Sequence, residues 1–73
     1  MVIFVIRLKE GGPEVKARMG DFAAKYKGGK LSRFYVGPEG PVAHIKARSV
    51  EVDFLERDIS FDKNVVEYYH IFS

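Results

Sequence analysis

The sequence predicts a small α+β domain, a two-layer sandwich in which one or two helices pack on one face of an antiparallel sheet. Three observations favour this class: segments with alternating apolar residues, one clear helical stripe, and Gly/Pro-rich turns between them. At 73 residues the chain has room for one domain, spanning residues 1–73, and 47% hydrophobic residues suffice for a core. The expected order is βαββ(α or β)β, and a second helix would make it ferredoxin-like.

The first strand is predicted over residues 2–8, where both faces begin apolar, as in a central strand. A Gly-Gly-Pro sequence ending at Pro13 then begins a helix, because proline suits the first helical position. Side chains at intervals of four, three and four residues form one helical face that we expect to pack on the sheet. These residues are Val15, Met19, Phe22 and Tyr26.

The sequence KYKGGK, residues 25–30, raises the question of a phosphate-binding loop. It follows the helical stripe, so its glycines are expected to end the helix, with Lys25, Lys27 and Lys30 near the negative end of the dipole. Helices bind phosphate at their N-termini, and the pattern GxxxxGK[ST] is absent. We therefore expect the lysines to support the helix end and to add loose contacts to a phosphate backbone.

Residues 31–36 and 42–48 predict two strands, which a turn-rich linker should join into a hairpin. Pro41 has no N–H for the ladder, so the second of these strands is expected to begin at a sheet edge or just outside the ladder.

Residues 49–58 fit two predictions. A strand is indicated by the alternation of Val50, Val52 and Phe54. A helix capped by Ser49 would instead share one face among Val52, Leu55 and Ile59. The β-rich composition shifts the prediction towards the strand.

A turn at residues 62–64 should precede a final strand over residues 65–72, rich in β-branched and aromatic residues. Helix cover on one face leaves the other to be covered by a second subunit. That other face carries Tyr69 and Ile71, or alternatively Tyr68, His70 and Phe72. As an oligomer interface we name Tyr69, Ile71 and Phe72. A terminal edge strand can also pair with its symmetry mate, whereas a central strand would simply be buried.

Charge is divided unevenly along the chain. Residues 1–48 hold ten Lys/Arg against four Asp/Glu, and residues 49–73 hold two against six, so a net +6 precedes a net −4. This division indicates either an anionic partner for the first part or internal pairing between the two parts.

A basic sheet face is the main candidate site. If Ala43, Ile45 and Ala47 face the helix, the alternate residues point outward, and cations, a tyrosine and a histidine gather there. The expected members are Arg7, Arg33, Tyr35, His44, Lys46 and Arg48. Such a face suits nucleic acid or another polyanion. The alternative is a solvated face on which Glu51 and Asp53 neutralise the cations across strands.

No catalytic or cofactor signature is present. His44 and His70 lie outside HxH and HExxH patterns, the serines lack a nucleophile elbow, the acidic residues lack calcium-loop spacing, and there is no cysteine for a disulfide or thiolate metal site. We therefore predict a non-enzymatic binding module without metal or cofactor. The alternative is a homo-oligomeric interaction domain that uses the final strand and an acidic segment. That acidic segment comprises Glu51, Asp53, Glu56, Asp58 and Asp62.

The apolar run at residues 2–6 is too short to span a bilayer, and Arg7 follows it rather than precedes it as in a signal peptide. We therefore expect a cytoplasmic protein without a membrane partner. The sequence lacks Gln, Thr, Cys and Trp and has one Asn, a composition typical of thermophiles.

Overall fold

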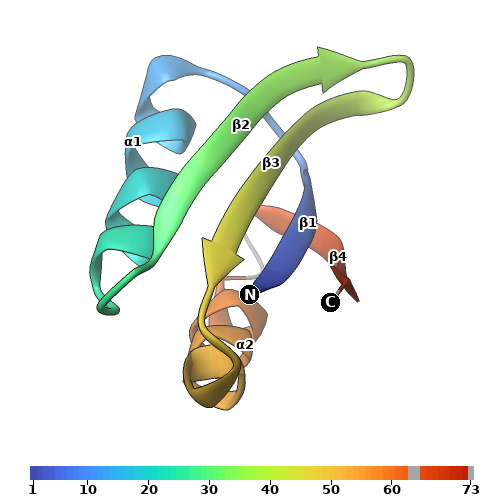
Figure 1. The fold of residues 1–73 in the computed structure, drawn as a ribbon. Helices are drawn as coiled ribbons and strands as arrows, with labels where there is room; N and C mark the ends of the chain where they lie inside the picture. Colours follow the sequence, from blue (N-terminus) through green and yellow to red (C-terminus); the bar gives the residue numbers. More distant parts are fainter. Residues whose placement is uncertain (63–64, 73) are drawn as a thin grey trace.

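The computed structural model describes residues 1–62 and 65–72. Along the chain lie β1 (Val2–Leu8), α1 (Pro13–Ala24), β2 (Lys30–Gly37), β3 (Gly40–Ala47), a 3₁₀ turn η1 (Ser49–Glu51), α2 (Val52–Phe61) and β4 (Val66–Phe72). The sheet has the order β2-β3-β1-β4, and all neighbouring strands are antiparallel (Figure 1). The α+β prediction is confirmed, and the element order βαββαβ is the one used by ferredoxin-like domains.

One core joins both helices to the same face of the sheet. Alternate residues of β1 and β3 pack with apolar residues of α1 and α2. The largest fully buried side chains are Phe4, Ile6, Leu8, Met19, Ile45, Leu55 and Ile59. Because both helices occupy this face, the opposite face of the sheet has no helix over it.

Helix α1 begins at Pro13, as its sequence predicts, but it ends at Ala24, so Tyr26 of the predicted stripe lies in the turn before Gly28. Pro13 stands in its first turn, and Val15 and Met19 are buried, whereas Phe22 and Tyr26 pack only partly against the core. The chain leaves the helix through Gly28, whose φ of 82° belongs to the left-handed region that glycine adopts without strain.

The strand preferred for residues 49–58 is wrong, because this segment forms η1 and α2. Leu55 and Ile59, four residues apart, are fully buried, whereas Val50 and Phe54 are exposed. The segment forms a helix rather than a strand because the helical spacing places both branched side chains against the core on one face. The predicted turn at residues 62–64 lies, apart from Asp62, outside the described residues.

The β2–β3 hairpin closes through Pro38 and Glu39, with Gly37 paired to Gly40. Pro41 lies opposite Val36 of β2 and beyond the last β1 partner of β3, so it stands where β3 projects past the central ladder. Strand β3 itself is interior, and β2 and β4 form the two edges. Among the described residues, no helix has the length and apolar character needed to cross a membrane.

Candidate nucleic-acid interface

The helix-free side of the sheet, here called the open face, consists of three cross-strand rows. In the order β2, β3, β1, β4, the first row holds Tyr35, Val42, Arg7 and Tyr68; the second holds Arg33, His44, Val5 and His70; the third holds Lys30, Lys46, Ile3 and Phe72. Paired residues share a face, so the register brings together five of the six residues predicted for the basic sheet face, and adds Lys30.

Cations gather on the β2–β3 half of the open face. Lys30 and Lys46 are direct cross-strand partners, an arrangement of like charges that costs stability. The guanidinium of Arg33 lies over the Tyr35 ring, 4.6 Å from its centre. None of these three cations takes part in an ion pair among the described residues.

His44 stands between the cations and the aromatic rings. Its Nε2 lies 3.3 Å from the Tyr35 hydroxyl, and the two rings meet edge to face at 5.5 Å. Burial, and then the nearby charge of Arg33, lowers the pKa of His44 below its ordinary value of 6.5. The side chain is therefore neutral at neutral pH and offers a ring rather than a charge.

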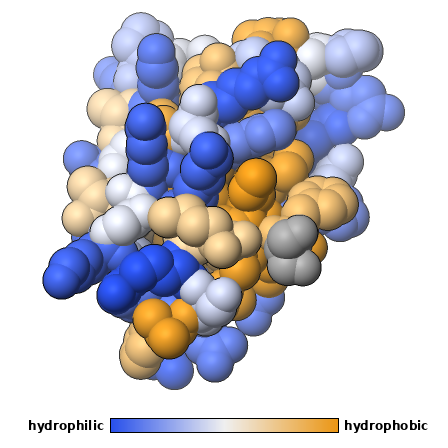
Figure 2. Space-filling view, in the orientation of Figure 1, coloured by the Kyte–Doolittle hydropathy of each residue, from blue (hydrophilic) through white to orange (hydrophobic). Residues whose placement is uncertain are grey.

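Aromatic rings line β4 on the same face. The rings of Tyr68 and His70 lie 5.5 Å apart, and those of His70 and Phe72 lie 6.4 Å apart. Phe72 is 56% exposed. Viewed as in Figure 1, the surface near the chain ends carries an apolar patch bordered by hydrophilic side chains (Figure 2). Tyr68 and His70 were not among the predicted nucleic-acid-binding residues, although their alternation with Phe72 places all three on one face.

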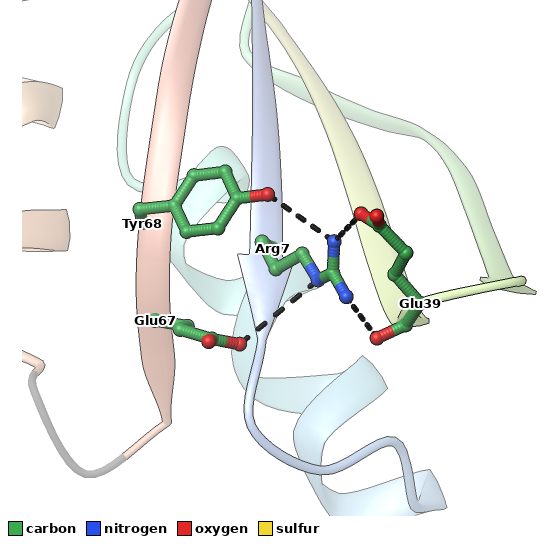
Figure 3. A network of polar contacts seen from close by, with 4 residues as sticks. All are labelled: Arg7, Glu39, Glu67 and Tyr68. Carbon is green, nitrogen blue, oxygen red and sulfur yellow. Dashed lines mark hydrogen bonds and ion pairs between the residues drawn. The ribbon is translucent and has the colours of Figure 1, made fainter.

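Arg7 lies at one end of the open face and is held by a polar network (Figure 3). Its guanidinium donates to the carboxylate and the backbone oxygen of Glu39 and, over 3.2 Å, to the Tyr68 hydroxyl. The Glu67 carboxylate lies 3.9 Å from Nε. The hydrogen bond to Glu39 raises the pKa of Arg7 above its ordinary value. Arg7 is thus on the face but already paired with an anion.

Three other predicted cations lie elsewhere. Arg48 follows β3, pairs with Glu51 and packs on Gly28, whereas Lys25 pairs with Asp58 at 3.2 Å in the helix layer. Lys27 is exposed in the turn after α1. The expectation that Glu51 pairs across strands is wrong, because it belongs to η1 and meets Arg48 from there.

Internal pairing between the two charged parts does occur, mostly on the helix side; on the open face, the Glu67 carboxylate lies 3.9 Å from Arg7. Arg18 contacts Asp62 at 2.6 Å, in addition to the Lys25–Asp58 and Arg48–Glu51 pairs. These pairs use three of the five carboxylates of the acidic segment. Among the described residues, Lys30, Arg33 and Lys46 of the open face remain outside this neutralisation, whereas Arg7 is paired with Glu39 and lies near Glu67.

The predicted oligomer residues lie on two sides of β4. Tyr69 points to the helix side, where its ring lies 6.1 Å from that of Phe4, and Ile71 pairs with Phe4 on that same side. Phe72 pairs with Ile3 on the open face. All three residues stand on an edge strand, one side of which has no partner strand.

The Tyr26–Asp58 contact makes stability depend on pH. The Tyr26 hydroxyl donates a hydrogen bond to the Asp58 carboxylate at 2.5 Å. This bond, and then the contact with Lys25, lowers the pKa of Asp58. Burial and the same contact with Asp58 raise the pKa of Tyr26 to about 12. The Asp58 contribution is therefore present above the unfolded pKa, about 3.9, and is lost as the pH falls through the folded value. Stability is also lost as the pH rises from about 10 towards 12, where unfolded tyrosine ionises first.

Replacing Tyr26 by Phe is expected to raise the pKa of Asp58 and to flatten the loss of stability in acid, because the main cause of the lowered pKa is removed. Carboxyl NMR titration of Asp58 and urea unfolding between about pH 2 and 7 measure both effects. An unchanged Asp58 titration in the variant would show that the hydroxyl does not hold this carboxylate.

No protein-family model matches the chain, and comparisons with curated proteins and with solved structures also give no match. Within residues 1–62 and 65–72, no cluster of three or more His, Cys, Asp or Glu side chains is arranged to hold a metal ion.

Proposed function

We propose that this chain binds single-stranded nucleic acid across the open face of its sheet. The observation that carries the proposal is the juxtaposition of Lys30, Arg33 and Lys46, which have no carboxylate partner among the described residues, with rings on the same face. Phosphates would contact the cations, and bases would stack on Tyr35, His44 or the β4 rings. A cytoplasmic, non-enzymatic binding role is part of this proposal.

A single strand fits this face better than a duplex. Stacking requires bases with free ring faces, which loops and single strands provide and which a base-paired helix conceals. The sheet offers at least one ring in each of the three rows, so successive bases can stack on successive rows. Like-charge repulsion between Lys30 and Lys46 would also fall when a phosphate lies between them.

Fluorescence anisotropy with labelled single-stranded RNA, single-stranded DNA and duplex DNA tests this function. At about 50 mM salt we expect saturable binding to single strands that weakens steeply at about 200 mM, with weaker binding to duplex. Absence of binding to both single strands at the lower salt concentration would refute the proposal, and a preference for duplex would refute the stacking arrangement.

A second candidate function is homo-oligomerisation through β4. The two sheet edges differ in their side chains: β2 carries Lys30 and Arg33, charges that discourage strand addition, whereas β4 exposes Tyr68, Ile71 and Phe72. Antiparallel pairing of two β4 strands would join two sheets into one and extend the open face across both copies.

Phe72→Glu is expected to convert such an oligomer into a monomer of about the chain mass, 8.3 kDa, because the charge would oppose burial at the contact. Light scattering coupled to size exclusion measures the mass. Val36→Glu is the control, since Val36 is also apolar and exposed but stands on β2. A monomeric wild-type protein, or an oligomer that survives Phe72→Glu, would count against this candidate.

A further inference from the structure

Arg7 differs from the other cations of the open face in its position and burial. It stands on the interior strand β1, and its side chain is only 16% exposed. Its Nε makes no hydrogen bond among the described residues, although the Glu67 carboxylate lies 3.9 Å away. A guanidinium fixed in this way presents planar donors of the kind that bind phosphate oxygens in pairs.

The carboxylate that pairs with the Arg7 guanidinium comes from the hairpin turn. Glu39 follows Pro38 in the two-residue connection between β2 and β3, and its side chain is 76% exposed. Its carboxylate has no other partner among the interactions of the described residues. An ion pair with one partner so exposed to water contributes little stability, so the Glu39 carboxylate can leave Arg7 when a competing anion arrives.

A cavity of about 340 Å³ adjoins this contact. Its lining includes Arg7, Tyr35, Val42 and the turn residues 37–40. Volumes of about 300 Å³ and above are typical of small-ligand sites. Because Tyr35, Val42 and Arg7 also form the first row of the open face, the cavity is continuous with the proposed interface.

We infer that Glu39 occupies a phosphate site, in which its carboxylate pairs with Arg7 until a phosphate group of the bound strand replaces it. This inference rests on the proposed function. The incoming phosphate takes the guanidinium donors, repels Glu39 and displaces it towards water, while the attached base lies in the cavity against Tyr35. Glu39 is therefore a competitor that weakens binding and excludes weakly held anions.

Glu39→Gln tests the inference because it removes the competing charge and keeps the size of the side chain. Anisotropy with a labelled single-stranded oligonucleotide at about 50 mM salt should show affinity about five- to tenfold above wild type. Asp21→Asn is the matched control: it changes the net charge equally, at an exposed position of α1. It should leave the affinity nearly unchanged.

The double variant Arg7→Gln/Glu39→Gln has the net charge of the wild-type protein and should lose the gain in affinity seen in Glu39→Gln. Circular dichroism should show that each variant is folded. A gain confined to Glu39→Gln and lost in the double variant supports the site. Three results overturn the inference and leave the proposed function standing. They are wild-type binding with no gain in affinity in Glu39→Gln, an equal gain in affinity in Asp21→Asn, and a gain in affinity that the double variant retains. Absence of binding by every variant overturns both.

Discussion

Leu55→Ala is expected to lower the free energy of unfolding by about 3 kcal/mol, because it leaves a cavity between α2 and the sheet. Leu55 is 0% exposed and belongs to the core that both helices share. A domain of this size is stabilised by only about 5 kcal/mol, so the variant should be partly unfolded at moderate temperature.

Phe54→Ala is the matched control for this prediction. The phenylalanine is larger than Leu55 and adjacent to it, but 54% of it is exposed, so its loss should cost less than about 1 kcal/mol. Urea unfolding followed by circular dichroism measures both variants. A larger loss for Phe54→Ala than for Leu55→Ala would mean that residues 52–61 do not pack as the structure shows.

Arg33→Ala/Lys46→Ala should weaken binding to a single-stranded oligonucleotide by about 30-fold at about 50 mM salt, because two phosphate contacts are lost. The plot of log K against log salt should also become shallower by about 1.4, since each phosphate contact on a single strand contributes about 0.7. Anisotropy titrations at four or more salt concentrations give both quantities.

The control for this prediction removes the same charge from the helix layer. Lys16 in α1 and Arg57 in α2 are exposed, and both helices lie on the far side of the sheet. Lys16→Ala/Arg57→Ala should therefore lower affinity only slightly. Equal losses in the two double variants would indicate attraction by net charge alone, and an unchanged slope in Arg33→Ala/Lys46→Ala would remove these residues from the interface.

Much of the fold follows from local patterns. The period of two in β1 and β3 determines which residues face the core, so Ala43, Ile45 and Ala47 lie inside while His44 and Lys46 lie outside, as expected. Pro13 and the helical stripe from Val15 to Phe22 likewise set the position of α1, although the helix ends at Ala24, before Tyr26. These features depend on neighbours within a few residues, and the sequence alone contains that information.

The segment at residues 49–58 shows where this information ends. Its apolar residues satisfy both a period of two and a helical period, so local preference does not choose between them. The choice follows from packing, because only the helix brings Leu55 and Ile59 together against a core built by distant strands. Tertiary contact outweighs propensity in a segment this short.

The candidate site divides in the same way. Alternation in the sequence predicted Arg33, Tyr35, His44 and Lys46 on one face. It did not reveal that β4 lies next to β1 and adds its rings to that face, because strand order depends on contacts between distant parts of the chain. Nor did it show that Glu39 reaches Arg7 from 32 residues away, or that Arg48 turns to Glu51. The sequence by itself determined which side chains share a strand face. Only the tertiary structure decided which strands adjoin and which cations are already neutralised. The reason is that pairing energies depend on distances in space, which sequence spacing does not set.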